Sequence, residues 1–277
     1  MIGALLSHEV RSTRRTLGTT IGVALGVGAL SLVVVALRIP VLGELGFALA
    51  VAVVTLITPL VLVVLAEHYW RTMYGREGYF TMTVPVRGST LFAVKVLHGI
   101  AVTVGALALT VGGAGAVVAV SASARGVGVA AAFQELSDGI GTVGAATVWF
   151  LAGCVLVQSV FTVVAGAAVM SIGAESRFNH LGFGAPVLGG VALYLVMQVL
   201  GLAAMLFVPF GLRITGPDAG TFVAQGMLAD FMQALRDPVG QNDPSVVGLG
   251  IVPLAVVATG VLAWWGAGSV ERRTSLR

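Results

Sequence analysis

Six long apolar runs separate short clusters of charged residues along the 277-residue chain. They cover residues 17–37, 45–66, 91–120, 143–172, 183–210 and 247–269. Each run reaches the ~20 residues that an α-helix needs to cross a bilayer. Charged residues make up only 10% of the chain and hydrophobic residues 57%, whereas a soluble domain carries about 25% charged residues. The sequence therefore predicts an all-α integral membrane protein, with one domain over residues 1–277 that contains six transmembrane helices.

The basic residues predict how these helices are oriented. If all six runs span the membrane, one side holds Arg11, Arg14, Arg15, Arg71, Arg76, Arg87, Lys95, Arg177, Arg272, Arg273 and Arg277. The other side holds only Arg38, Arg125, Arg213 and Arg236. Because positive residues are retained on the cytoplasmic side, we expect a multi-pass protein of the cell membrane. Both termini and the loops 67–90 and 173–182 are expected in the cytoplasm, and the segment 211–246 outside.

The first fifteen residues read as an amphipathic helix. Its apolar face would hold Met1, Ile2, Leu5, Leu6 and Val10, and the charged residues Glu9, Arg11, Arg14 and Arg15 would lie largely elsewhere. A helix of this kind lies in the membrane interface, so we expect an interfacial helix before the first span. The alternative is a basic tail that only sets the topology.

The segment 67–90 is more elaborate than a connection between two spans requires. Residues 67–74 can continue the second helix, until Gly75 supplies a conformation that helices avoid. Pro85 ends the short stretch after Gly75, and Ser89 or Thr90 can cap the third span. The pattern predicts a short structured projection at the inner surface, suited to docking a cytoplasmic partner. An interfacial anchor without a partner is the alternative.

A few polar residues within or beside the apolar runs are candidates for function. Gln158 and Gln198 lie near the middle of the fourth and fifth runs, and Lys95 and His98 share a helical face at the start of the third. These four residues could line a translocation path. Alternatively, the two glutamines hold helices together by hydrogen bonds, and Lys95 extends to the interface as a topology anchor.

Between the fifth and sixth runs, residues 220–237 are expected to form an external helix. Apolar residues recur there at near-helical spacing, and Asp237–Pro238 ends the pattern.

The sequence argues against catalysis by this chain and against several kinds of partner. It contains no GxxxxGK[ST] phosphate-binding loop and no HExxH metal motif, and its four histidines are scattered. The single cysteine, Cys154, excludes an intramolecular disulfide. The basic residues lie beside hydrophobic spans rather than in one patch, which disfavours nucleic-acid binding. We therefore expect neither an enzyme nor a bound cofactor, and any energy for work must come from another subunit.

Two stretches of this sequence resemble the permease subunits of ABC-2 type ATP-binding-cassette transporters. The first is the charged start Ser7-His-Glu-Val-Arg-Ser-Thr-Arg-Arg-Thr16. The second is Arg76-Glu-Gly-Tyr-Phe-Thr-Met-Thr-Val-Pro-Val86 followed by Lys95, which resembles the family's "EGY" element, "TLPV"-like turn and later lysine. Val84 stands where the family frequently has Leu, and Arg87-Gly88 where Ser or Arg often follows. The match at the level of motifs covers about thirty residues.

The resemblance implies that residues 67–85 form a coupling element that contacts an ATPase. Its expected residues are Glu67, Arg71, Tyr74, Arg76, Glu77, Gly78, Tyr79 and Pro85. The family also implies a half-transporter that pairs with an identical or related permease and binds two cytoplasmic ATPase subunits, which would hold the ATP and Mg²⁺. The expected function is export of an amphiphilic cargo. A non-transporting membrane sensor or scaffold and an ion-coupled secondary carrier are the alternatives, and the scarcity of intramembrane acids counts against the carrier.

Overall fold

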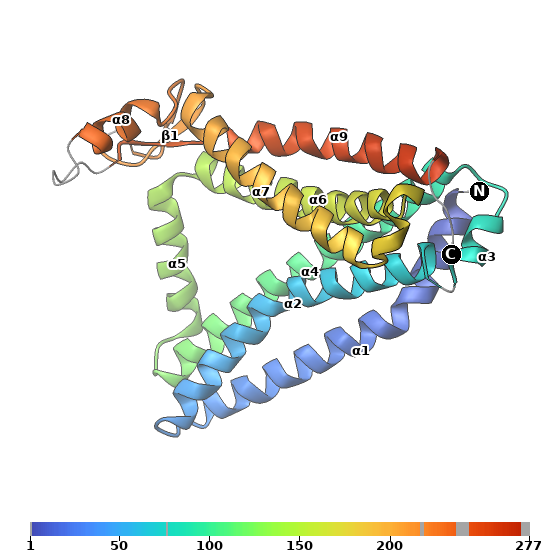
Figure 1. The fold of residues 1–277 in the computed structure, drawn as a ribbon. Helices are drawn as coiled ribbons and strands as arrows, with labels where there is room; N and C mark the ends of the chain where they lie inside the picture. Colours follow the sequence, from blue (N-terminus) through green and yellow to red (C-terminus); the bar gives the residue numbers. More distant parts are fainter. Residues whose placement is uncertain (1, 76, 217–218, 237–243, 273–277) are drawn as a thin grey trace. The chain divides into compact units, whose positions relative to one another are not determined.

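The computed structural model describes residues 2–75, 77–216, 219–236 and 244–272. Six of its helices are long and apolar enough to cross a membrane (Figure 1). They are α1 (Ile2–Ala36), α2 (Leu42–Met73), α4 (Gly88–Ala124), α6 (Ala145–Gly173), α7 (Gly184–Phe207) and α9 (Ile251–Arg272). The expectation of six such helices is confirmed, and the chain has the character of a multi-pass membrane protein. The fold is mainly helical rather than all-α, because a small three-stranded sheet lies between α7 and α9.

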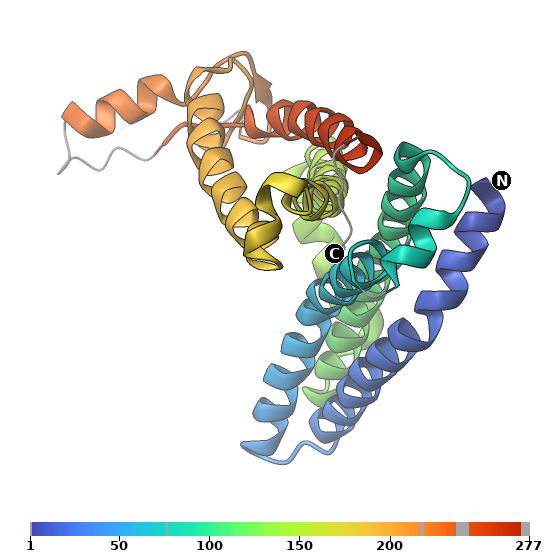
Figure 2. The same cartoon turned by 45° about the vertical axis from the view of Figure 1, so that its right-hand side comes forward.

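The chain folds as two compact units. The first extends to Gly141 and includes Val270–Arg272, and the second extends from Thr142 to Ser269. In the first unit α1, α2 and α4 lie side by side (Figure 2). Their apolar core contains Leu17, Ile57, Val61 and Ala106.

Small residues allow these helices to approach closely. A Cβ atom on Gly46 of α2 would lie 2.9 Å from the carbonyl oxygen of Ser31 of α1, so this position has no room for a side chain. Between α2 and α4, the hydroxyls of Thr58 and Thr110 form a hydrogen bond of 3.1 Å. Small residues and hydroxyls are the usual means by which membrane helices pack, because lipid provides no hydrophobic force between them.

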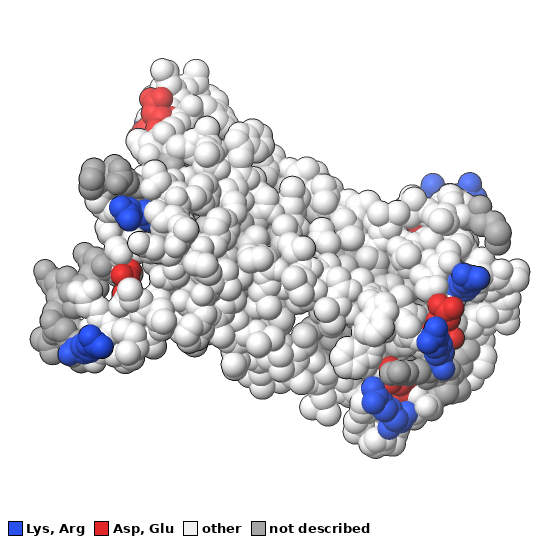
Figure 3. Space-filling model, turned by 90° about the horizontal axis from the view of Figure 1, so that it is seen from above, with Lys and Arg blue, Asp and Glu red and all other residues white. Residues whose placement is uncertain are grey.

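The outer faces of the long helices are apolar and exposed. Leu30 of α1 is 67% exposed, Val63 of α2 65% and Val111 of α4 72%. On the face shown in Figure 3, the described charged residues lie in small patches separated by wide uncharged surface. An uncharged apolar surface of this extent suits contact with lipid rather than water.

The starts of α1 and α4 differ from the expectations. Instead of a separate interfacial helix over residues 1–15, one helix runs without interruption from Ile2 to Ala36. The only breaker near the expected boundary is Gly18, and one glycine costs a helix only about 1 kcal/mol. The prediction that Ser89 or Thr90 caps the third span was wrong. Arg87 is the extended residue before α4, and its carbonyl oxygen already accepts the N–H of Thr90, so both hydroxyl residues lie inside the helix.

The segment 67–90 contains more helix than loop. The predicted continuation of the second helix is confirmed, since α2 ends at Met73. A short helix, α3 (Gly78–Thr83), follows, and extended backbone at Val84 separates it from α4. A helix that was not expected, α5 (Val129–Val143), follows α4.

The second unit contains α6, α7 and α9, and a folded segment connects α7 to α9. It contains β1 (Gly211–Arg213), β2 (Phe222–Val223), α8 (Leu228–Arg236) and β3 (Val246–Gly248). The strands form an antiparallel sheet in the order β2-β1-β3. A 3-10 helix, η1 (Ser176–Leu181), connects α6 to α7.

The helix expected over residues 220–237 exists only as α8. The earlier part of that range pairs with β1 in the register Leu212↔Phe222, and the Phe222 ring stacks on Phe210 at a centroid distance of 6.2 Å. The sequence pattern indicated one amphipathic face but could not show that the backbone of Phe222 has a strand partner. The expected end at Asp237–Pro238 lies outside the described residues.

One carboxylate holds α8 to β3. Asp230 accepts hydrogen bonds from the backbone N–H of Ser245 (2.6 Å) and of Val246 (3.0 Å), and from the Ser245 hydroxyl. Partial burial acts to raise the pKa of Asp230, but the hydrogen bonds from Val246 and Ser245 outweigh it, and the pKa lies below its ordinary value. A carboxylate whose pKa is lowered on folding stabilises the folded state at neutral pH.

We therefore predict that Asp230→Asn loosens the contact between α8 and β3 by about 1.5 kcal/mol, because a charged acceptor of two N–H groups is lost. The expected result is roughly tenfold faster hydrogen exchange at the Val246 amide. In the wild type, the stabilisation is complete above the ordinary Asp pKa of about 4 and is lost as the pH falls below it. Asp138→Asn, on the exposed surface of α5, is the matched control and should leave the Val246 amide unchanged. Equal exchange in both variants would contradict the assignment.

Candidate functional site

A cluster of buried polar side chains lies where the start of α1, the end of α2 and the start of α4 meet. Its members are Glu9 and Thr13 from α1, His68 and Thr72 from α2, and Lys95 and His98 from α4. All six are at most 9% exposed. We call this group the charged cluster. Buried ionisable groups in a bundle of apolar helices are costly unless paired, so they mark a site of function or of strong structural constraint.

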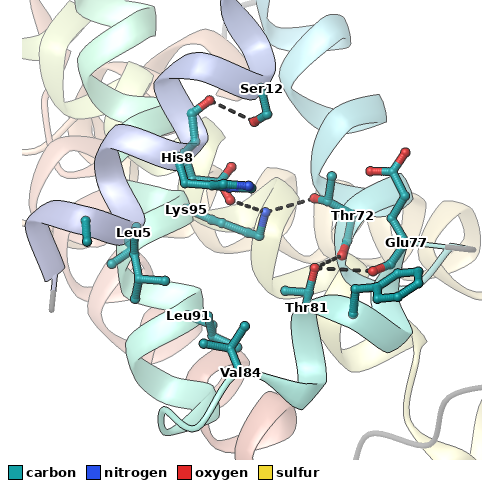
Figure 4. Close-up of a pocket in the computed structure, with 13 residues that line it drawn as sticks. Leu5, His8, Ser12, Thr72, Glu77, Thr81, Val84, Leu91 and Lys95 are labelled. Atoms are coloured by element: carbon teal, nitrogen blue, oxygen red, sulfur yellow. Dashed lines mark hydrogen bonds and ion pairs between the residues drawn. The ribbon is translucent and has the colours of Figure 1, made fainter.

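The centre of the charged cluster is an ion pair between α4 and α1. The Lys95 ammonium lies 2.7 Å from Glu9 Oε1 and donates a second hydrogen bond of 2.8 Å to Thr72 Oγ1 (Figure 4). The other carboxylate oxygen, Glu9 Oε2, lies 3.2 Å from His68 Nε2. One carboxylate and one ammonium cancel in charge, and their hydrogen bonds hold three helices together.

A second contact lies deeper along the same helices. Thr13 Oγ1 is 3.0 Å from His98 Nε2 and donates a hydrogen bond to the carbonyl oxygen of Glu9. The imidazoles of His68 on α2 and His98 on α4 therefore both contact α1.

Helical spacing explains why these residues meet. Glu9 and Thr13 are four residues apart, as are His68 and Thr72, and Lys95 and His98 are three apart. Residues at these spacings share a helical face. Each helix therefore contributes one polar face to the same point, and on α1 the apolar core begins at Leu17, one turn beyond Thr13.

A cavity of about 480 Å³ adjoins the charged cluster. Glu9, Thr72 and Lys95 belong to its polar lining, together with His8, Ser12, Glu77 and Thr81. The apolar lining comes from α1, from α3 and the residue after it, and from α4. Its apolar residues include Leu5, Phe80, Val84, Leu91 and Val94.

The short helix α3 is fastened to the charged cluster. Thr81 Oγ1 donates a hydrogen bond of 2.7 Å to the carbonyl oxygen of Thr72, the residue whose hydroxyl accepts from Lys95 (Figure 4). On the outer side, Arg71 and Glu77 form an ion pair of 3.3 Å in which both side chains are about half exposed. Contacts therefore run from α3 through Thr72 and Lys95 to Glu9, from one helix to the next.

Most of the expected coupling residues lie around α3. Glu77 precedes this helix, Gly78 and Tyr79 begin it, Pro85 follows it, and Arg71 lies against Glu77. Glu67 is exposed on α2, and the ring of Tyr74 packs 5.4 Å from that of Trp70. Arg76 lies outside the described residues.

Two expectations about charged residues were wrong. Glu9 does not lie with Arg11, Arg14 and Arg15, which are exposed, but is buried against α2 and α4. Lys95 does not extend to the interface, because its side chain is 5% exposed and its ammonium is held by Glu9. The expected shared face of Lys95 and His98 is confirmed.

Gln158 and Gln198 belong to the second unit, so they are not members of the charged cluster. Gln158 is exposed on α6. Gln198 is exposed on α7, and its amide donates a hydrogen bond of 2.7 Å to the hydroxyl of Tyr194 on the same helix. That bond does not join two helices. Sequence reasoning missed Thr13, His68 and Thr72; the spacing of His68 and Thr72 on a continued helix was the available signal.

The described residues provide no evidence of a metal site. Over the described ranges, His, Cys, Asp and Glu side chains form no group of three or more that could hold a metal ion. No protein-family model, curated protein or solved structure matches the chain. The geometry of the charged cluster and α3 therefore carries the functional argument.

We predict that Lys95→Met lowers the free energy of unfolding by about 3–5 kcal/mol, because it leaves the Glu9 carboxylate buried without its cation. The double variant Glu9→Gln/Lys95→Met should regain most of this loss. Denaturant unfolding in bicelles measures both.

The matched control is Glu77→Gln, which breaks the exposed pair with Arg71. An exposed pair contributes about 0–1 kcal/mol, so this variant should remain close to the wild type. A double variant as unstable as Lys95→Met alone would show that the charge pairing is not what stabilises this end of the bundle.

Proposed function

We propose that this chain is the permease subunit of an ABC exporter, and that α3 with the adjoining end of α2 receives the movement of a separate ATPase. One observation carries the proposal: α3 is linked by Thr81, Thr72, Lys95 and Glu9 to three helices that are long enough to span a membrane. A force on α3 would reach all three helices, because the links are short hydrogen bonds and the two made by Lys95 are buried.

The exposed surface of α3 supports docking of a protein. Phe80 is 79% exposed and Tyr79 50%, and the half-exposed Arg71–Glu77 pair lies beside them. Aromatic and arginine side chains are enriched where protein interfaces gain most of their binding energy. Thr81 attaches this six-residue helix to the end of α2, so these groups lie next to the charged cluster.

The need for a partner follows from the motifs that the sequence lacks. The chain has no phosphate-binding loop, so ATP and Mg²⁺ would be held by the ATPase subunits, two per transporter. In this proposal the α3 end faces the cytoplasm of the cell, as the distribution of basic residues predicts. Closure of the ATPases would shift α1, α2 and α4 together between two packed states, which moves an amphiphilic cargo outward.

The ion-coupled carrier gains one observation, the contact between the Glu9 carboxylate and the His68 imidazole, because such groups can relay protons. The position of the charged cluster at one end of three helices disfavours it, since carriers bind their ions near the bilayer midplane. If a proton gradient alone drives cargo uptake or efflux in vesicles that contain this chain and no ATP, the carrier is favoured.

The test is affinity purification of the tagged chain from the membranes of its own cell. We expect an ABC ATPase to co-purify with the wild type and to be lost with Phe80→Asp, because a charge replaces an exposed aromatic anchor. Phe231→Asp is the matched control, since Phe231 is 43% exposed on α8 in the other unit. It should retain the ATPase.

Absence of any ABC ATPase from the wild-type preparation would contradict the proposed function. Loss of the ATPase with both variants would place the contact away from α3. Two results together would favour the non-transporting scaffold. The ATPase would bind but hydrolyse ATP at the same rate with and without this chain, and cargo efflux would be unchanged when the chain is deleted.

A further inference from the structure

The cavity beside the charged cluster has the size of a small-molecule site. Its volume is about 480 Å³, and ligand cavities usually measure about 300–1,000 Å³. All of its lining residues belong to the first unit, so its walls are placed relative to one another. The cavity therefore can be treated as a binding site of that unit alone.

The polar and apolar walls of this cavity are separated. Figure 4 shows Leu5, Leu91 and Val84 together on one side of the Lys95 side chain, and Ser12 on the opposite side. A molecule that fills the cavity must match this division. It needs an apolar chain for one wall and a polar group that lies next to Lys95.

The buried ammonium of Lys95 determines which polar group fits. An ammonium has three N–H donors. Among the described residues, that of Lys95 donates to Glu9 Oε1 at 2.7 Å and to Thr72 Oγ1 at 2.8 Å, which leaves one donor. The side chain is 5% exposed and lines the cavity. Because a buried donor without an acceptor is costly, an acceptor on a ligand would gain a strong, charge-assisted hydrogen bond there.

The charges of the lining favour an acceptor that is neutral. The lining contains two carboxylates, Glu9 and Glu77, and one ammonium, Lys95. An anionic ligand would be repelled by both carboxylates. A cationic ligand would be repelled by Lys95, while Glu9 is already paired with Lys95 and Glu77 with Arg71. The carbonyl oxygen of an ester or amide accepts a hydrogen bond without either repulsion.

We propose that this cavity binds an acyl ester or acyl amide, whose carbonyl oxygen accepts from Lys95 and whose apolar chain lies against Leu91 and Val94. Such a ligand contacts α1, α3 and α4 together, so it would hold α3 to the bundle in addition to the Thr81 hydrogen bond. The inference goes beyond the proposed function and does not rest on it. Its test needs neither ATPase nor transport, so either proposal can fail alone.

The first test is photolabelling of the full chain in vesicles of ether-linked phosphatidylcholine, which has no acyl ester. The probe is decanoylglycerol with a diazirine at the end of its chain. We expect it to label the peptide that contains Leu91 and Val94, and unlabelled decanoylglycerol to compete. The decyl ether of glycerol lacks only the carbonyl oxygen and should compete roughly tenfold less well, as should decanoate and decylammonium. Equal competition by the ester and the ether would overturn the proposal.

The second test blocks the cavity from an exposed position, so that the fold is preserved. Ala4 lies on the exposed surface of α1 and lines the cavity, and Ala4→Phe should abolish the labelling that decanoylglycerol competes for. Ala29→Phe, also at an exposed position of α1 but outside the lining, is the matched control and should be labelled as the wild type is. Labelling that survives in Ala4→Phe, or that is lost in both variants, would overturn the proposal.

A third measurement identifies the source of the acyl group by repeating the labelling in vesicles of ester-linked phosphatidylcholine. Weaker labelling than in ether-linked vesicles would show that a phospholipid chain occupies the cavity, because its ester competes with the probe. Equal labelling in both vesicles would assign the cavity to a free acyl compound. Either result supports the site, whereas labelling without competition in both kinds of vesicle would contradict it.

Discussion

The pairing of Glu9 with Lys95 is the interaction on which the first unit depends. Each group alone would be a buried charge beside apolar helices, and removing the other would leave it uncompensated. Together they cancel, and each makes a further polar contact, Lys95 with Thr72 and Glu9 with His68. The helices α1, α2 and α4 must therefore meet with these faces inward. That constraint fixes the rotation of all three helices, and it places Thr72 where the carbonyl oxygen can hold α3.

Sequence reasoning succeeded where the information is local. The six long helices follow from runs of apolar residues, because a bilayer requires about 20 of them in a row. The shared face of Lys95 and His98 follows from their spacing of three residues. The pairing of Lys95 with Glu9 does not follow, since the two residues are 86 positions apart and on different helices. For the same reason the sequence predicts Glu9 on the polar face with the nearby arginines, whereas its carboxylate is buried because it pairs with Lys95.

The errors in the second unit have a related cause. Phe222 fits the helical spacing that continues into α8, but its backbone pairs with Leu212 and its ring packs against Phe150 and Phe210. Periodicity describes one face of a segment and says nothing about hydrogen bonds to a distant strand. Gln198 shows the same limit in another way. Its place in the middle of a span was evident, but only the structure shows that its partner is Tyr194, on its own helix.

The two units handle their polar groups differently, and this difference suggests a division of labour in the proposed transporter. In the first unit the polar groups of the charged cluster are buried and meet one another, so they hold three helices in one arrangement and can transmit a displacement of α3 without separating. In the second unit the Tyr194–Gln198 pair is exposed and lies within one helix. The first unit would then receive the movement of the ATPase, whereas the exposed polar pair of the second unit takes no part in holding its own helices together.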